Sequence, residues 1–489
     1  MSAAPAQPSF LSSPRGKLTL ALLCTVALLD FVDASIVNVA LPTIRHRLHF
    51  SVQSLQWVLS GYLLTYGGFM LLGGRAADLL GRRRLLVAGT SLFAVSSLAA
   101  GLAGSEGTLI AARLVQGLGA AMTFPAALST LTTTFHEGSD RHRALGAWGA
   151  VAGLASAAGV FLGGVISQGP GWRWVFFVNL PVCAVVLFAA FRLLSGERPR
   201  SALKDFDALG ALLATSGMLL LVFAIVKAPE VGWGDARTIG ELAGAGALLG
   251  LFAFNETRRR TPLFPFSIFR IPGLAAANAT QMIAIAGFYS MFFFITLFMQ
   301  NVLGYSPVKA GSAWLPTTFG VAVGAGICTQ LLSRAGTRPV IAAGALVGAG
   351  GVFWLSRVPV HATYLGNLLP PMVMMSLGLG AVFVGVQTAA NDGVPSAQAG
   401  LAAALVNTSQ QLGAALGLAI FSAIATSRTN DLLAAHATRP RALTSGFGDA
   451  LFAASVFLLV SAAVALRATN TRGAGPETPA EALPEPASP

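Results

Sequence analysis

Two acidic residues near the middle of the first apolar segment are the strongest candidates for chemistry. Asp30 and Asp33 lie inside an apolar run from about residue 18 to residue 41. A spacing of three residues places both side chains on one face of a helix. A charge at the centre of a bilayer costs about 2.5–3.5 kcal/mol on insertion scales, so such residues usually face a cavity or a charged partner. The pattern predicts a functional pair or, as the simpler alternative, a buried salt bridge that only holds helices together.

Arg113, in the fourth apolar segment, is the predicted partner of these carboxylates. The first and fourth segments cross in opposite directions, and at 1.5 Å per residue the depths of Asp33 and Arg113 differ by only about 5 Å. Gln116 lies one turn further along on the same helical face. A carboxylate that alternates between an arginine and a proton is a two-state carrier. We therefore predict that Asp33, Asp30, Arg113 and Gln116 couple the protein to protons.

A basic segment between the second and third apolar runs holds a second group of candidates. It extends from Gly74 to Arg84 and contains Asp78, Gly81, Arg82 and Arg83. We expect a loop whose glycines allow a tight turn. The aspartate can cap a helix N-terminus, and the arginines can meet lipid phosphates or helix C-termini. A basic membrane loop explains the arginines alone, but it does not explain an aspartate flanked by glycines.

The fifth apolar run is dense in glycine, including Gly159, Gly163 and Gly164. Small residues four apart allow two helices to approach closely. Plain helix packing accounts for this pattern as well as a special role does.

The composition indicates that lipid surrounds the elements that carry these residues. The chain has 489 residues, of which 54% are hydrophobic and only 10% are charged, whereas globular domains carry about 25% charged residues. A membrane span needs about 20 mainly apolar residues, and each span must be a helix because lipid leaves no backbone group unpaired. The fourteen predicted spans are residues 18–41, 55–74, 85–104, 108–131, 144–167, 173–194, 207–227, 237–255, 272–301, 309–332, 339–356, 363–390, 399–427 and 448–468.

The distribution of Lys and Arg predicts that both ends of the chain are cytoplasmic. With that orientation the inner segments hold twice as many Lys and Arg residues as the outer ones, as the positive-inside rule requires. A weak internal repeat consists of Gly81-Arg82-Arg83 and Gly336-Thr337-Arg338. Two six-helix halves separated by a two-helix insert would produce it. The predicted parts are a cytoplasmic tail (1–17), an N-terminal bundle (18–194), an insert of helices 7 and 8 (195–271), a C-terminal bundle (272–468) and a disordered cytoplasmic tail (469–489).

Several other classes of function find little support in the sequence. The net charge of +12 is spread over short clusters between apolar runs, so it forms no stripe for nucleic acid. The three cysteines lie inside apolar runs and lack the spacing of a disulfide framework or a zinc site. No histidine has a carboxylate placed to complete a metal set, and no phosphate-binding loop is present, which argues against ATP as the energy source. The first apolar run is too long for a cleaved signal peptide.

Six stretches together resemble one transporter family. They are Asp33 to Pro42 (DASIVNVALP), Gly74 to Arg84, Arg113 to Ala121 (RLVQGLGAA), Trp172 to Pro181 (WRWVFFVNLP), Asn301 to Pro307 and Asn407 to Gly413. In this order they are similar to the motifs of the fourteen-span drug:proton antiporters, a branch of the major facilitator superfamily. The stretch from Gly74 to Arg84 resembles the superfamily's gating motif, and that from Arg113 resembles its proton-coupling motif. The fifth-span motif, which the family links to the direction of export, departs from the family pattern, because Val160 stands where a proline is usual.

The resemblance implies two helical bundles around a central cavity and export of small hydrophobic or cationic organic compounds in exchange for protons. It also implies a monomer in the inner or plasma membrane and no cofactor, while the residues themselves indicate no enzymatic activity and no metal site. The residues expected to line the cavity are Tyr66, Phe124, Phe288, Tyr289, Gln300, Asn407 and Gln411. Export of one endogenous metabolite or self-made antibiotic is the alternative within this class. A membrane receptor that transports nothing is the alternative outside it, and it has no need of buried carboxylates.

Overall fold

Helices account for the secondary structure that the computed structural model describes, which covers residues 11, 13–135, 139–194, 207–259, 262, 266–392, 394 and 399–470. In chain order the helices are α1 (Pro14–Leu48), α2 (Val52–Leu55), α3 (Trp57–Leu80), α4 (Arg82–Gly101), α5 (Glu106–Thr134), α6 (Ser139–Gln168), α7 (Trp174–Phe177), α8 (Asn179–Leu193), α9 (Ala208–Val231), α10 (Ala236–Arg258), the 3₁₀ turn η3 (Phe266–Arg270), α11 (Leu274–Asn301), α12 (Pro307–Ala313), α13 (Leu315–Ala335), α14 (Thr337–Ser356), the π turn η4 (Tyr364–Leu368), α15 (Leu369–Asn391), α16 (Ala399–Ala434) and α17 (Arg439–Ala465).

Many of these helices are long enough to cross a membrane. Within the described residues, 12 helices are long and apolar enough to cross a bilayer. Helices α3 and α6, with 24 and 30 residues, occupy the second and fifth predicted spans but are not among those 12. The protein is therefore a multi-span helical membrane protein, and the full count of fourteen spans stays a prediction.

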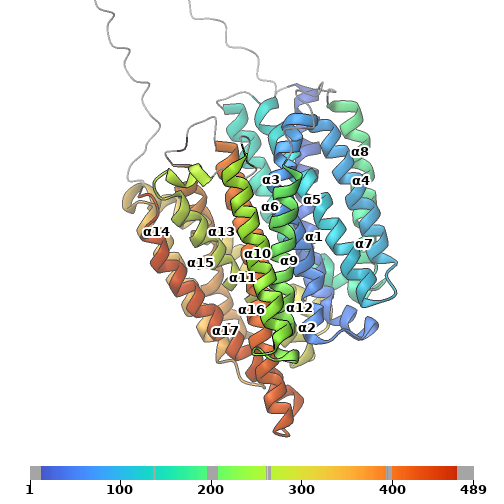
Figure 1. Ribbon diagram of the computed structural model, residues 1–489, viewed down its shortest axis with the longest axis vertical. Coiled ribbons are helices and arrows are strands. Elements are labelled where there is room, and N and C mark those ends of the chain that lie inside the picture. The colour runs from blue at the N-terminus through green and yellow to red at the C-terminus, as the bar shows by residue number, and fades with distance from the viewer. Residues whose placement is uncertain are drawn as a thin grey trace, which may run out of the picture.

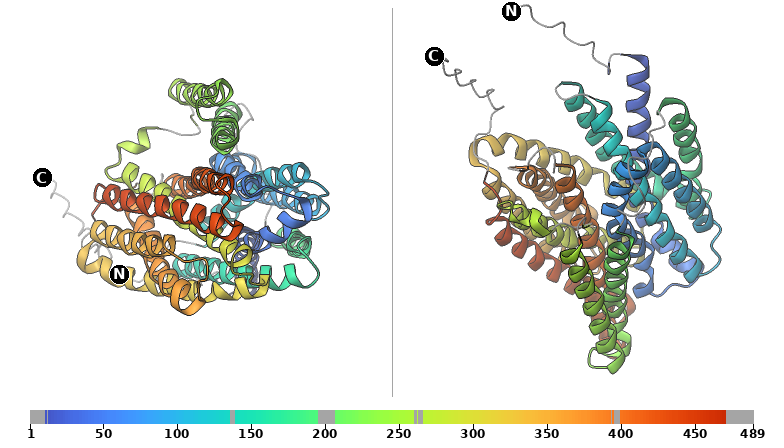
Figure 2. Two further views of the ribbon diagram at one scale, coloured as in Figure 1. Left: turned by 90° about the horizontal axis from the view of Figure 1, so that it is seen from below. Right: turned by 45° about the horizontal axis from the view of Figure 1, so that its top comes forward.

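The long helices lie roughly side by side, with the N-terminal and C-terminal helices on opposite sides of the molecule (Figure 1). Helices α1, α3, α4, α5, α6 and α8 contact one another, and α11 and α13 to α17 form a second contacting set. The two sets meet where α3 packs on α16 and where α6 packs on α13 and on the short helix α12 that precedes it. The view from below shows the same separation (Figure 2). The predicted tails, 1–17 and 469–489, lie mostly outside the described residues.

Helices α9 and α10 form a hairpin that packs on the seam between the two sets. Helix α9 contacts both α3 and α16, whereas α10 packs mainly on α9. The Oγ1 atom of Thr215 on α9 would lie 2.4 Å from a Cβ added at Gly68 of α3, so the two backbones are close. Asp207 caps α9 and accepts a hydrogen bond from Asn255 of α10 at 3.0 Å. These contacts fix the hairpin beside the place where the two halves meet.

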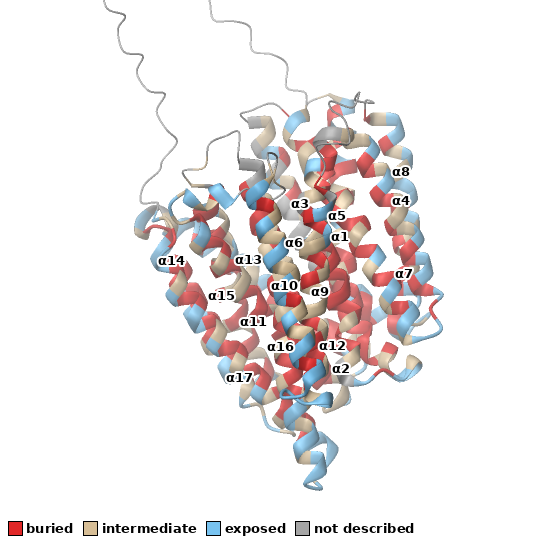
Figure 3. Cartoon of the chain, viewed as in Figure 1, coloured by how far each residue is buried: buried red, intermediate tan, exposed pale blue. Residues whose placement is uncertain are grey.

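Burial follows the expectation for a helical bundle in lipid. Buried residues lie along the inner faces of the helices, and exposed ones lie around the outside (Figure 3). Many exposed side chains are large and apolar, such as Phe188, Phe319 and Leu365, which are 65%, 73% and 74% exposed. In water such a surface would cause aggregation, but in a bilayer it contacts lipid tails.

The predicted loop from Gly74 to Arg84 is wrong in its extent. Helix α3 continues through Gly74 to Leu80, and α4 begins at Arg82, so Gly81 alone connects them. Its φ of 100° is a backbone conformation that glycine adopts readily and other residues rarely do. One such residue is enough to redirect the chain, which is why the segment needs no longer loop. Gly336, with a φ of 87°, likewise connects α13 to α14. The two copies of the weak internal repeat therefore occupy matching connections between helices.

Candidate functional site

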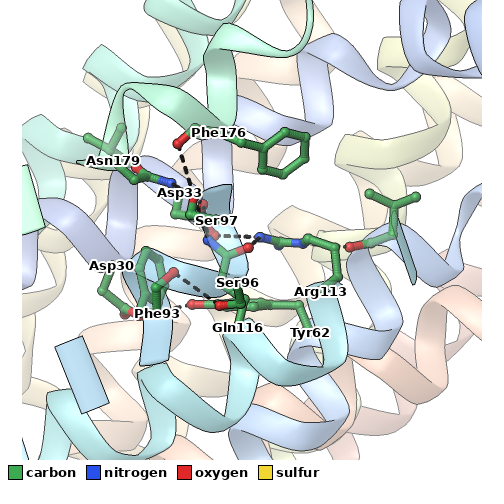
Figure 4. Close-up of polar contacts among 12 residues, drawn as sticks. Asp30, Asp33, Tyr62, Phe93, Ser96, Ser97, Arg113, Gln116, Phe176 and Asn179 are labelled. Atoms are coloured by element: carbon green, nitrogen blue, oxygen red, sulfur yellow. Dashed lines mark hydrogen bonds and ion pairs between the residues drawn. The ribbon is translucent and has the colours of Figure 1, made fainter. Parts of the chain in front are cut away.

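A buried polar network in the N-terminal half is built around Asp33. Its Oδ2 atom lies 2.7 Å from Nη1 of Arg113, so the predicted pairing of these residues is present. Its Oδ1 atom accepts hydrogen bonds from Gln116 Nε2 at 3.0 Å and from Asn179 Nδ2 at 2.7 Å. Helices α1, α5 and α8 each contribute to the network (Figure 4). The three donors leave this carboxylate well satisfied and hold three helices together.

Arg113 is held as firmly as the carboxylate that it binds. Its Nη1 also donates to Gln116 Oε1 at 2.8 Å, and its Nε donates to the Val58 carbonyl at 2.9 Å. The guanidinium lies 4.2 Å from the centre of the Tyr62 ring, a cation–π arrangement that is stronger in a desolvated site. Arg113 and Asp33 are both 0% exposed. Removing one member of a buried pair costs about 3–5 kcal/mol, because the other charge stays buried without a partner.

Asn179 and Ser97 belong to the network but were not among the predicted site residues. Asn179 Nδ2 and Gln116 Nε2 both donate to Ser97 Oγ, at 3.1 and 3.3 Å. Ser97 in turn donates to the Phe176 carbonyl at 2.9 Å. Asn179 could have been found from the sequence, because it is a lone amide between apolar residues in a stretch that carries the family resemblance. Ser97 stands among other small residues of α4, and no pattern distinguishes it.

Asp30 lies one turn before Asp33 but in a different environment. Its two carboxylate oxygens accept hydrogen bonds from the hydroxyls of Tyr62 and Tyr66, at 3.1 and 3.0 Å. Within the described part of the chain, no Lys, Arg or His nitrogen lies within ion-pair distance of it. Spacing alone could not distinguish the two carboxylates. In the structure Asp33 is ion-paired, whereas Asp30 is held by two phenol groups.

Aromatic rings extend from Asp30 across the N-terminal half. The Tyr66 ring meets the Phe124 ring edge-on at 6.2 Å, and Phe124 meets Trp148 at 5.4 Å. Tyr66 and Phe124, both predicted to line the substrate cavity, are therefore in contact with each other, and the cavity itself stays a prediction. Trp148 on α6 is a further member that the sequence did not single out.

The other predicted cavity residues are spread over the C-terminal half. Gln411 of α16 lies at the seam, its Cβ 2.8 Å from a Cβ added at Gly67 of α3. Gln300 of α11 donates to the Val39 carbonyl of α1 at 3.0 Å, which also joins the halves. Phe288 instead packs inside its own half, against Gly348 of α14. Tyr289 and Asn407 are partly buried on α11 and α16. A shared cavity for all seven residues remains a prediction.

The glycines of α6 permit close approaches to both halves. A Cβ at Gly159 would lie 2.0 Å from Ser35 Oγ, and one at Gly163 would lie 2.6 Å from the Ile36 carbonyl, both on α1. A Cβ at Gly164 would lie 2.6 Å from the carbonyl of Pro307 on α12. Each of these contacts excludes any larger residue without movement. Helix α6 therefore touches α1 within two residues of Asp33 and also touches the opposite half.

The predicted gating residues lie at one end of the N-terminal half. Arg82 donates to Ser129 Oγ at 2.8 Å and to Thr133 Oγ1 at 2.9 Å, which ties the start of α4 to the end of α5. The Arg83 guanidinium lies 5.2 Å from the ring centre of Phe191 on α8. The side chain of Asp78 lies outside the described residues, so its predicted capping contact is untested.

The described helices of membrane-crossing length, with a buried ion pair between them, are those of a polytopic membrane protein. The chain belongs to the major facilitator superfamily, whose family model matches residues 23–418.

Relatives and solved structures agree with this assignment. The chain is 40% identical to the cephamycin export protein CmcT of Amycolatopsis lactamdurans, over 91% of this chain and 90% of that protein. It is 37% identical to the puromycin resistance protein pur8 of Streptomyces alboniger, over 88% and 86% of the two chains. A bacterial homolog of the human lysosomal transporter Spinster, solved in an inward-facing and occupied conformation, has the same fold. It matches with a TM-score of 0.65 at 16% identity, over 93% of this chain and 97% of that one.

Proposed function

We propose that the protein exports small organic compounds, antibiotics among them, in exchange for protons. The observation that carries the proposal is the fully buried pair of Asp33 and Arg113, bonded at 2.7 Å. Protonation of Asp33 removes one charge of the pair and so releases Arg113, which gives the protein two states that differ in proton content. Export relatives that match nearly the whole chain support the direction of transport.

The proposal includes the arrangement in the membrane. Fourteen spans with both ends in the cytoplasm fit the Lys and Arg distribution, and they fit the positions of α3 and α6 among the other helices. The protein would act as a monomer in the plasma membrane, as a transporter with no enzymatic activity. It would use protons as coupling ion and no other cofactor.

Hydrophobic or cationic compounds are the proposed substrates. Asp30 provides a carboxyl group without an ion partner in the described part of the chain, and Tyr62, Tyr66 and Phe124 provide aromatic faces beside it. Aromatic faces attract cations, most strongly in desolvated sites. A flat, basic aromatic compound suits such surroundings.

Inverted membrane vesicles test the proposal. Respiration acidifies their interior, and addition of puromycin should then release protons in vesicles that contain the protein, reported by recovery of the fluorescence of a quenched acridine dye. Cells that express the protein should also tolerate more puromycin. A membrane receptor that transports nothing would give neither response.

A dedicated exporter of one compound is the second candidate. Several relatives bear the names of single antibiotics, namely cephamycin, puromycin, tetracenomycin C and lincomycin. A susceptibility panel covering these four classes distinguishes the two candidates, because a dedicated exporter should protect against one class only.

A further inference from the structure

A cavity with both polar and apolar walls lies at the end of the bundle where α16 connects to α17. Its volume is about 300 Å³, roughly ten times the 30 Å³ that one water molecule occupies in the liquid. It lies where three parts of the chain meet. Its polar lining consists of Arg45, Ser51, Glu230, Thr426, Thr429, Asn430 and Arg439. The first two belong to the N-terminal half, Glu230 to the α9–α10 hairpin, and the last four to the C-terminal half.

The charges in this cavity do not balance. Within the described residues, no carboxylate lies within 4.0 Å of a side-chain nitrogen of Arg45 or Arg439. In the described part of the chain, the Arg45 side chain donates a hydrogen bond from Nε to the Phe50 carbonyl at 3.3 Å, which leaves its terminal nitrogens available. Glu230 is already paired, with Lys227 at 2.8 Å. Two like charges that line one cavity repel each other, and an anion between them would remove that repulsion.

The start of α17 adds to the positive character of the cavity. Arg439 and Leu443, one turn apart in the first two turns of α17, both line it. The N-terminus of a helix carries a partial positive charge and favours anions. The side chain of Thr438, the N-cap residue, makes no capping hydrogen bond there. Ser51, Thr429 and Asn430 supply neutral groups that can donate hydrogen bonds to an anion.

We propose that this cavity binds a phosphate-type oxyanion on the outer side of the membrane and that binding keeps the outer side closed. Arginine guanidinium groups match oxyanions well, because their donors form a rigid fork. An anion that contacts both Arg45 and Arg439 bridges the two halves, and the site is lost when those halves separate. The outer location and the closing motion rest on the proposed orientation and transport function. Free phosphate and a lipid headgroup share the required chemistry.

Thermal unfolding of the purified full chain in neutral detergent tests the binding site. Sodium phosphate should raise the unfolding temperature in a saturable way, with ionic strength held constant by sodium chloride. Arg45→Gln and Arg439→Gln should each weaken phosphate binding roughly tenfold or more, since a hydrogen bond to a charged group is lost. Arg428→Gln is the matched control, because Arg428 is a neighbouring arginine that pairs with Asp449 at 3.3 Å and does not line the cavity.

A second arm identifies the source of the oxyanion. In phosphate-free nanodiscs, replacing phosphatidylcholine by phosphatidylglycerol should stabilise the wild type but not Arg45→Gln or Arg439→Gln if a lipid headgroup occupies the site. Stabilisation by free phosphate alone assigns the site to a soluble anion. If neither anion stabilises the wild type, or if both arginine variants respond as the wild type does, the site is refuted.

Spin labels test the closure. One label is placed at Gly104, where an added Cβ meets nothing within 4 Å, and one at His361, both in connections between helices. Cys24, Cys183 and Cys328 are replaced by Ala in this background. Saturating phosphate should shift the label pair toward its shorter distance, and an unchanged or longer distance refutes the closing role. Both measurements work without transport, so a failure of the export proposal would leave the binding result intact.

Discussion

Replacing Asp33 by Asn separates a proton-coupling role from a purely structural one. The substitution preserves the shape of the side chain and removes its charge. In the wild type, Oδ1 accepts from Gln116 and Asn179, and Oδ2 is paired with Arg113. The side chain of asparagine keeps one oxygen acceptor and carries an NH₂ donor in place of the other oxygen. Either orientation of the new amide sets its NH₂ group against a donor, Arg113 in one case and Gln116 with Asn179 in the other, and in both cases the guanidinium loses its carboxylate.

The expected loss of stability follows from the burial of Arg113. It is 0% exposed, and an unpaired buried charge costs about 3–5 kcal/mol. The bonds to Val58 and Gln116 and the Tyr62 ring remain, so the lower part of this range is expected. Asp33→Asn should therefore fold, with a measurable fall in unfolding temperature, and should transport no substrate against a gradient.

The double variant Asp33→Asn with Arg113→Gln provides the discriminating measurement. It removes both charges, so no buried charge is left unpaired, and most of the lost stability should return. Unfolding temperature in detergent measures the first effect, and proton-linked dye recovery in inverted vesicles measures the second. Both variants should lack proton coupling, although only the single variant is strongly destabilised.

Two results would refute this reasoning. If the double variant regains both stability and proton-coupled transport, the pair only holds helices together. If Asp33→Asn alone exchanges substrate for protons at the wild-type rate, the proton is carried elsewhere, and Asp30 becomes the leading candidate.

Three further predictions follow from neighbouring contacts. Asn179→Leu removes a 2.7 Å bond to Asp33 and should cost about 1.5–3 kcal/mol, the usual value for a hydrogen bond to a charged group; an unchanged unfolding temperature would contradict it. Gly164→Ala places a Cβ 2.6 Å from the Pro307 carbonyl and should slow transport by separating α6 from α12, while Gly146→Ala, with open space around it, should behave as wild type; equal transport by the two variants would oppose this. Tyr66→Phe removes one hydroxyl from Asp30 and should change the apparent affinity for ethidium more than the yield of folded protein, and an unchanged affinity would count against a substrate role for Asp30.

The pairing of Asp33 with Arg113 could be predicted from the sequence because one coordinate, the depth in the membrane, largely fixes where a residue of a spanning helix lies. Apolar runs fix where each helix enters the bilayer, and a rise of 1.5 Å per residue then gives the depth of each side chain. Two unlike charges at similar depth have few other partners in a chain with 10% charged residues. The helices themselves were predictable for the same reason, since each long apolar run has only one backbone solution in lipid.

The direction in which a side chain points around its helix axis was harder to predict than its depth in the membrane. Spacing placed Asp30 and Asp33 on one face, yet only Asp33 reaches Arg113, while Asp30 is bonded to Tyr62 and Tyr66. Phe288, one of the residues predicted to line the cavity, packs against Gly348 within its own half. Both outcomes depend on how neighbouring helices turn toward one another, and no pattern in a single apolar run encodes that.

The extent of the segment after α3 was missed for a local reason. The glycines at positions 74 and 81 suggested a loop, but Gly74 lies within α3, where glycine also serves close packing: a Cβ added at the adjacent Gly73 would overlap the Ala121 carbonyl of α5. Only Gly81 has the positive φ that a turn needs. Glycine serves both purposes in membrane helices, so its presence alone does not distinguish a turn from a packing contact.

Helix α1 links the ion pair to the contacts between the two halves. Asp33 lies on its inward face, Ser35 and Ile36 lie against the glycines of α6, and the Val39 carbonyl accepts from Gln300 of α11 at 3.0 Å. These groups are less than two helical turns apart on one continuous helix. A rigid helix transmits a small displacement along its length. The packed interfaces that it touches then switch between discrete arrangements and do not deform gradually. A change in the bond between Asp33 and Arg113 therefore has a direct physical route to the contacts that hold the two halves together, which is the connection that proton-driven export requires.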